Sequence, residues 1–140
     1  MPCKHLAKNI NCYLSFAGHT TSVWIVGSSI NKNAFIKARK RPGGVSLGLQ
    51  WIGVNIWWQG RSGLIVSKIR QQMNVMMRLD DPPDCIIIHI GGNDIGNVRI
   101  YYLQLQLKQF ITWVSEQLPH ASIVFPPRYC HAVNDGTLRI

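Results

Sequence analysis

Acidic residues are scarce in this chain. Its 140 residues include six Asp and Glu against fifteen Lys and Arg, which gives a formal net charge of +9 at pH 7. A positive field of this size favours polyanionic partners such as nucleic acid or anionic lipid. The basic residues cluster in one place, at Lys37, Arg39, Lys40 and Arg41, which we call the basic cluster. A cluster this short is more often a solvated helix end, so weak nucleic-acid binding through the basic surface is the minor alternative.

Long hydrophobic runs are also missing. The clearest apolar run, from Cys85 to Ile90, has the length of a buried strand, far short of the roughly 18 residues that a membrane-spanning helix needs. Lys4 and Lys8 are not followed by the apolar core of a signal peptide. We therefore expect an intracellular, cytoplasmic protein with no membrane span.

Cysteine pairs of the kind that bind zinc are absent as well. The chain has four cysteines, which lie far apart and read as reduced thiols: Cys3, Cys12, Cys85 and Cys130. A composition of 46% hydrophobic and 15% charged residues is typical of a globular protein, and the length fits one domain. We expect a poorly ordered lead-in over residues 1–21 and a single domain over residues 22–140.

What the sequence does contain is an alternation of strand and helix patterns. Short runs rich in β-branched and apolar residues, bounded by glycine or proline turns, predict strands over residues 22–26, 54–58, 85–90 and 122–125. Helical patterns follow the first three strands, and a short extended piece is expected over residues 45–49. This alternation predicts a doubly wound, mostly parallel α/β sheet with helices on both faces.

The apolar residues of the expected helices recur on one face. In the second helix this face includes Met73, Met76 and Met77, a stripe that favours core packing over cofactor binding. In the third helix it comprises Leu103, Leu107, Phe110, Ile111 and Val114. The strand over residues 85–90 is almost entirely apolar, which suggests burial on both faces.

Small and polar residues follow three of the strands, at the sheet edge where α/β proteins bind ligands. They are Gly27-Ser28-Ser29, Gly60-Arg61-Ser62-Gly63 and Gly91-Gly92-Asn93-Asp94. The Ser29 hydroxyl is a candidate nucleophile, while the N–H groups of Ser29 and Gly60 and the Asn93 amide are candidate donors to an oxyanion. In the simpler alternative, Ser28 or Ser29 caps the first helix and Asn93-Asp94 caps the third.

These motifs resemble the first three blocks of the SGNH hydrolases, also called GDSL esterases and lipases. The strings Ser22–Ile30, Ile56–Gly60 and Ile88–Asp94 are also similar to SGNH-type esterase domains of vertebrate genomes, some of them associated with mobile elements. The resemblance implies a three-layer α/β/α sandwich with a mostly parallel, flavodoxin-like sheet. It also implies a small-molecule acyl ester as substrate and no metal or cofactor.

Carried over to this sequence, the resemblance assigns a role to each motif residue. Ser29 becomes the nucleophile, with Gly60 and Asn93 completing the oxyanion hole. Gly27, Gly91 and Asp94 support the motifs, and Asp94 is expected to order its loop rather than to react.

The chain departs from the family pattern in two places. Ser28 replaces the usual Asp before the nucleophile, and no Asp-x-x-His block occurs, since Asp135 is followed three positions later by Leu138. The sequence therefore looks like the front part of such a domain, with the last strand and helix missing. His131 is the surrogate base in this interpretation, with Asp135 as its partner, and His89 is read as a satisfied core histidine. A non-catalytic SGNH-like binding module is the alternative.

Overall fold

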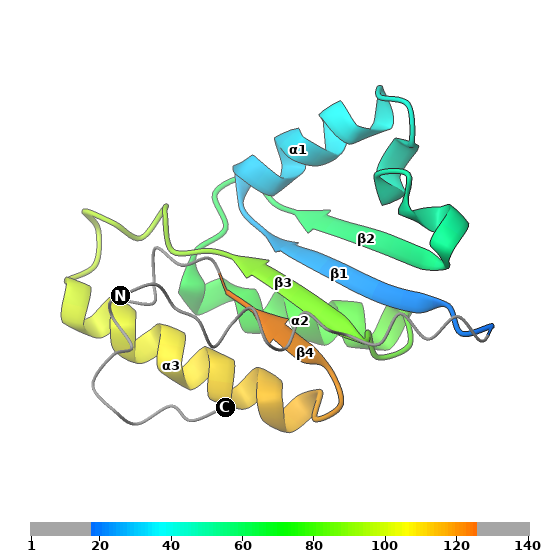
Figure 1. Cartoon of the computed structure of the whole chain (residues 1–140). Helices are drawn as coiled ribbons and strands as arrows, with labels where there is room; N and C mark the ends of the chain where they lie inside the picture. Colours follow the sequence, from blue (N-terminus) through cyan, green and yellow to red (C-terminus); the bar gives the residue numbers. More distant parts are fainter. Residues whose placement is uncertain (1–17, 126–140) are drawn as a thin grey trace, which may run out of the picture.

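The computed structural model describes residues 18–125 of the chain as a four-stranded sheet with three α-helices (Figure 1). The elements are β1 (Thr21–Gly27), α1 (Ser29–Arg39), β2 (Val54–Gly60), α2 (Val66–Leu79), β3 (Cys85–His89), α3 (Ile100–Gln117) and β4 (Ser122–Val124), with two short 3-10 helices, η1 (Gly44–Ser46) and η2 (Leu49–Ile52). The four expected strands and the three helices are confirmed to within about two residues at most ends, as such boundaries allow.

The strands are all parallel in this part of the chain and follow the order β2-β1-β3-β4. Helix α1 covers one face of the sheet, and α2 and α3 cover the other (Figure 1). This arrangement confirms the predicted three-layer α/β/α fold. The strand order reverses direction between β1 and β3, which is where such sheets bind their ligands. Within residues 18–125, no helix is both long and apolar enough to cross a membrane.

The core lies between the sheet and the pair α2 and α3. Trp24 and Val26 of β1 and Ile86 and Ile88 of β3 are fully buried there. The predicted helix faces are confirmed, because these residues are buried: Met73, Met76, Leu103, Leu107, Phe110, Ile111 and Val114. Met77 is half-buried and packs against the core. Helical periodicity therefore identified the core sides of both helices correctly.

Strand β3 is not buried on both faces as its apolar sequence suggested. Ile86 and Ile88 are buried against α2 and α3, whereas Cys85, Ile87 and His89 on the opposite face are only half-buried. The reason is the position of α1, which packs over β2 and, to a smaller extent, over β1. The apolar pattern correctly predicted a strand, but it could not indicate that α1 leaves this face of β3 partly uncovered.

The short extended piece expected over residues 45–49 is also wrong, because the segment forms the 3-10 helix η1 and a turn that leads into η2. Gly43, Gly44 and Gly48 have φ values of 98°, 63° and 77°, and Leu47 has a φ of 55°. The Gly48 N–H donates to the Gly43 carbonyl at 3.0 Å and closes the loop. Left-handed residues at this density favour tight turns over a strand, whatever the β-propensity of Val45.

The same segment protects the outer edge of β2. The Ile56 N–H donates to the Ser46 hydroxyl at 3.3 Å, and the Trp58 indole N–H donates to the Val45 carbonyl at 2.7 Å. An open strand edge invites pairing with other chains. The contacts with Val45 and Ser46 thus cover part of the exposed edge of β2.

Candidate functional site

The ends of three strands meet at one edge of the sheet. Gly27, the last residue of β1, is in register with Gly60 at the end of β2 and with His89 at the end of β3. The Arg61 N–H donates to the Gly27 carbonyl at 2.9 Å, which ties the chain after β2 to the end of β1. The first two motifs therefore begin side by side, and the third begins two residues beyond the neighbouring end of β3.

Two glycines allow the first turn of α1 to lie directly on these strand ends. A Cβ on Gly60 would collide with the Lys32 nitrogen and lie 2.6 Å from the Lys32 Cα. A Cβ on Gly27 would collide with the His89 carbonyl and lie 2.5 Å from the Asn31 Nδ2. Only glycine permits so close an approach. Ser29 is the first residue of this same turn of α1.

The N-terminus of α1 carries no side-chain cap. Ser28 occupies the N-cap position and is buried, and its carbonyl accepts hydrogen bonds from Asn31 and Lys32, but its hydroxyl caps nothing. The interpretation of Ser28 as a capping side chain is therefore wrong. A helix N-terminus has unsatisfied N–H groups and a partial positive charge. The half-buried Ser29 is placed at this end of the helix.

The Asn93 side chain is held in a fixed orientation. Its Nδ2 donates to the Leu64 carbonyl at 3.0 Å, and its backbone carbonyl accepts from the Asn97 Nδ2 at 3.1 Å. An amide nitrogen carries two N–H bonds, so one remains for a further acceptor. Gly91, with a φ of 102°, forms the turn between β3 and Asn93 in a conformation that favours glycine.

Asp94 is buried and contacts the N-terminus of α2. Its two carboxylate oxygens lie 3.4 and 3.2 Å from the N–H of Val66, the first residue of that helix. Burial raises the pKa of Asp94 above its usual value, and the Val66 hydrogen bond opposes the rise. The expectation that Asn93-Asp94 caps the third helix is wrong, because α3 begins at Ile100 after Arg99. Asp94 caps α2 instead, which the sequence could not reveal because the two residues are 28 positions apart.

The sequence assigned roles to two histidines, and the structure describes only one of them. His131 and its possible partner Asp135 lie outside the described residues. His89 is half-buried, and its Nδ1 is buried with no hydrogen-bond partner among residues 18–125, so it is not the satisfied core histidine expected. Asn31, whose buried Nδ2 also lacks a partner there, was missed by the sequence reasoning. A short amide side chain in the first turn of the helix that follows Gly27 is the sequence signal that would have found it.

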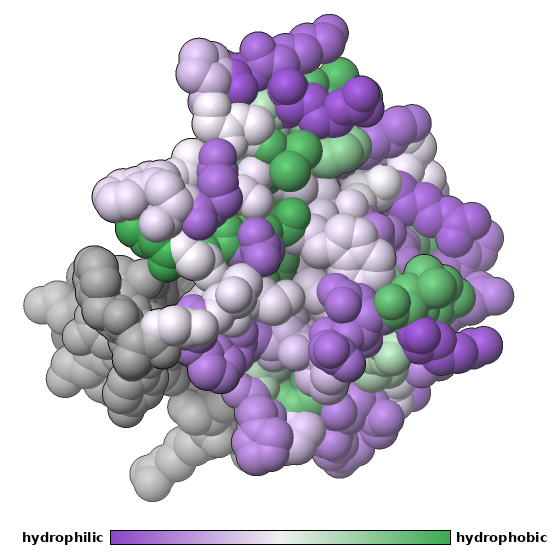
Figure 2. Space-filling view, turned by 90° about the vertical axis from the view of Figure 1, so that its right-hand side faces the viewer, coloured by the Kyte–Doolittle hydropathy of each residue, from purple (hydrophilic) through white to green (hydrophobic). Residues whose placement is uncertain are grey.

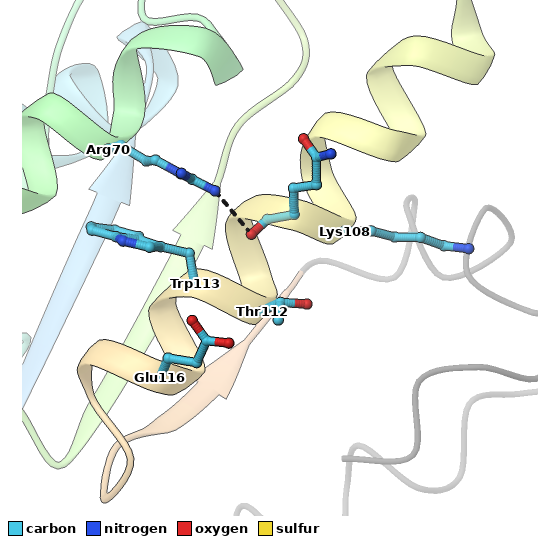
Figure 3. A pocket seen from close by; sticks show the side chains of 6 residues that line it. Arg70, Lys108, Thr112, Trp113 and Glu116 are labelled. Carbon is cyan, nitrogen blue, oxygen red and sulfur yellow. Dashed lines mark hydrogen bonds between the residues drawn. The ribbon is translucent and has the colours of Figure 1, made fainter.

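Two surface hollows bear on the location of the site. One lies between α2 and α3, where the Arg70 guanidinium stands over the Trp113 ring, 5.3 Å from its centroid, and donates to the Gln109 carbonyl at 3.3 Å (Figure 3). None of the predicted site residues lines it. The second hollow lies between the end of β2 and α2 and includes Gly60 in its lining.

Comparisons with known proteins support the fold. No protein-family model and no curated protein matches the chain. The esterase AlinE4, of the SGNH-hydrolase family, matches with a TM-score of 0.62 and 19% identity over 79% of this chain and 63% of AlinE4. A Parabacteroides merdae protein described as GDSL-like gives a TM-score of 0.56 and 18% identity over 75% of this chain and 58% of that one.

A third match is LAE5, an alpha/beta hydrolase enzyme from the metagenome of Lake Arreo, with a TM-score of 0.52 and 16% identity over 75% of this chain and 59% of LAE5. The chain thus spans less than two thirds of the length of these structures. The described part of the chain has the fold of the SGNH hydrolases.

Proposed function

We propose that this chain is an SGNH-type serine esterase domain that hydrolyses small acyl esters, with Ser29 as the nucleophile. The observation that carries the proposal is the packing of Gly60 against the uncapped first turn of α1, in which Ser29 is the first residue. The shared fold with the esterase AlinE4 supports it. Asn93 follows β3, the strand that pairs with β1, and its side-chain amide has one N–H that is not used by the Leu64 carbonyl.

In the proposed reaction the Ser29 Oγ attacks the carbonyl carbon of the ester, and its proton passes to a base. The negative charge that develops on the carbonyl oxygen is stabilised by the N–H groups of Ser29, Gly60 and Asn93. Collapse of this intermediate breaks the bond to the alkoxy group, which leaves as the alcohol with the proton from the base. Water then attacks the acyl-enzyme in the same way and releases the acid. His131 is the proposed base.

Covalent labelling tests this proposal directly. A fluorophosphonate should modify Ser29 of the wild-type protein, detected by peptide mass spectrometry, and Ser29→Ala should remove the label. Ser28→Ala is the matched control and should keep it, because the Ser28 hydroxyl makes no capping hydrogen bond. His131→Ala should slow labelling by about a hundredfold, since a general base contributes on the order of 10² or more.

Two results would count against an active esterase. Labelling that persists in Ser29→Ala would exclude Ser29 as the nucleophile. No labelling of wild-type protein, with circular dichroism showing a folded α/β protein, would favour the non-catalytic SGNH-like binding module instead.

We also propose, as a second candidate, weak binding of single-stranded nucleic acid at the end of the molecule that carries the basic cluster. The first 79 residues contain no Asp or Glu, and the cluster residues Lys37, Arg39, Lys40 and Arg41 are all exposed at the C-terminal end of α1. Trp51, 82% exposed, lies on η2 in the segment that joins α1 to β2, which is on the right-hand side of Figure 1. Seen from this side, hydrophobic residues are scattered among a majority of hydrophilic ones (Figure 2). A basic surface that also carries an exposed aromatic ring is typical of single-strand binding, and this candidate suits the resemblance to mobile-element domains.

Salt dependence tests this second candidate. Neutralising Lys40 and Arg41 to Gln should reduce the slope of log K against log salt for single-stranded RNA by about 1.4, since each phosphate contact contributes about 0.7. Lys68→Gln with Arg78→Gln removes the same charge from α2 and should leave the slope unchanged. Fluorescence anisotropy over a salt series measures both. Binding that is independent of salt, or equal slopes for the two double variants, would exclude this surface.

A further inference from the structure

Exposed apolar side chains gather in the segment that joins β3 to α3 and in the first two turns of α3. This part of the chain lies on the left-hand side of Figure 1, at the edge toward which the strands point. Five large hydrophobic residues are exposed there, and we call them the apolar patch: Ile95, Ile100, Tyr101, Tyr102 and Leu105. Exposed apolar surface of this kind marks a place where a protein binds a partner or a membrane.

The turn that carries Ile95 is held in place by hydrogen bonds. The N–H groups of Asn97 and Val98 donate to the Asp94 carbonyl at 3.0 and 2.9 Å. The Asn97 side chain donates in addition to the Asn93 carbonyl at 3.1 Å. The 59% exposure of Ile95 therefore belongs to an ordered turn.

The start of α3 is apolar on its outer side as well as toward the core. Leu103 is buried in the core, whereas Tyr101 is 70% exposed. The rings of Tyr101 and Tyr102 are in edge contact, with centroids 5.6 Å apart. Leu105 follows Tyr101 by one helical turn, so the two side chains lie on the same side of the helix.

The charges around the apolar patch are of one sign. Between Asp94 and Glu116 the sequence contains no Asp or Glu, and the Asp94 carboxylate is buried against the start of α2. The exposed Arg99 lies between Ile95 and Ile100 in the chain. Two copies of a chain with a net charge of +9 repel each other, whereas an anionic lipid surface attracts each of them. Charge therefore favours a lipid surface over a second copy.

We propose that the apolar patch docks this protein on the surface of an anionic lipid bilayer. The aliphatic side chains of the patch are then buried at the boundary between headgroups and acyl chains. The Tyr rings suit this depth, because one end of each ring is apolar and the other carries a hydroxyl group that remains hydrated. Arg99 lies beside the anionic headgroups. The docking does not depend on Ser29 and is independent of the esterase proposal.

Vesicle co-sedimentation of the full chain tests the inference. The wild type should bind vesicles of equal parts phosphatidylcholine and phosphatidylserine, and bind vesicles of phosphatidylcholine alone about tenfold more weakly. Tyr101→Ser with Leu105→Ser should weaken binding to the anionic vesicles by about tenfold or more, because less apolar area is buried. Val75→Ser with Leu79→Ser is the matched control and should bind as the wild type does. These two residues are also exposed, apolar and one helical turn apart, but they lie on α2.

A second pair of variants tests the contribution of charge. Arg99→Gln should weaken binding to the anionic vesicles about fivefold, the value of one cation near such a surface. Arg78→Gln removes an equally exposed cation from the end of α2 and should leave the affinity unchanged. All of these side chains are exposed, so each variant should keep the circular dichroism spectrum of the wild type.

Three results would overturn the inference: no binding to the anionic vesicles, equal binding to the neutral ones, or an equal loss in the two members of either pair of variants. Sedimentation velocity without lipid decides the alternative of a second copy. A wild-type dimer that Tyr101→Ser with Leu105→Ser dissociates would assign the apolar patch to self-association and overturn the docking. A monomer that binds the anionic vesicles would support it.

Discussion

Gly60→Ala is expected to lower the free energy of unfolding by about 3 kcal/mol, at the upper end of the usual cost of overpacking. The added methyl group would meet the Lys32 nitrogen and Cα and the Asn31 carbonyl carbon. All three are backbone atoms in the first turn of α1, so no flexible side chain can move aside. Urea denaturation followed by circular dichroism measures the loss.

Gly92→Ala is the matched control for this substitution. A Cβ on Gly92 would have no neighbour within 4 Å, and its φ is not in the left-handed region. We expect its unfolding free energy to stay within about 0.5 kcal/mol of the wild type, as for ordinary surface changes. An equally stable Gly60→Ala protein would show that α1 does not pack on the end of β2 as described.

The same variant bears on the proposed chemistry. Relief of the collision requires the first turn of α1, which includes Ser29, to shift relative to the end of β2. A displacement of about 1 Å can reduce a positioned reaction by on the order of a hundredfold. We therefore expect fluorophosphonate labelling to fall far more in folded Gly60→Ala than in Gly92→Ala.

Asp94→Ala is expected to cost about 2 kcal/mol of stability. The substitution leaves the Val66 N–H at the start of α2 without its acceptor. Asp94→Asn retains an oxygen that can accept from Val66 and should lose much less. Thermal or urea unfolding of the two variants beside the wild type makes the comparison. Equal losses would mean that the Val66 hydrogen bond does not stabilise α2.

The ionisation of Asp94 gives this comparison a pH dependence of known sign. Burial raises the folded-state pKa of Asp94 above its ordinary value of 3.8. Below that value the carboxyl is protonated in both states, so it makes no pH-dependent contribution. As the pH rises from 3.8 through the raised pKa, the unfolded chain ionises first and the wild type loses stability. Asp94→Asn cannot ionise at this position, so the unfolding free energy of the wild type should fall relative to that of the variant over the same pH interval. If the unfolding free energy of the wild type rose relative to that of Asp94→Asn, the Val66 hydrogen bond would outweigh the cost of burying the charge.

The element pattern and the positions of the motifs were readable from the sequence. The face formed by Leu103, Leu107 and Phe110 is buried as predicted, and the glycines after the strands lie at one sheet edge. These features depend on side-chain periodicity and on strands that end at small residues, which are local properties. The turns over residues 43–48 escaped prediction, because Leu47 adopts a left-handed conformation that its residue type disfavours.

By itself, then, the sequence determined the alternating α/β architecture, the core faces of its helices and the strand ends at which a site is expected. Only the tertiary structure decided that Asp94 caps α2, that Leu64 holds Asn93 and that Gln72 donates to the Gln59 carbonyl. The contacts of Asp94 and Asn93 join residues 28 and 29 positions apart. Such contacts depend on strand order and register, which place distant segments together, whereas the spacing of residues along the chain encodes only the local conformation.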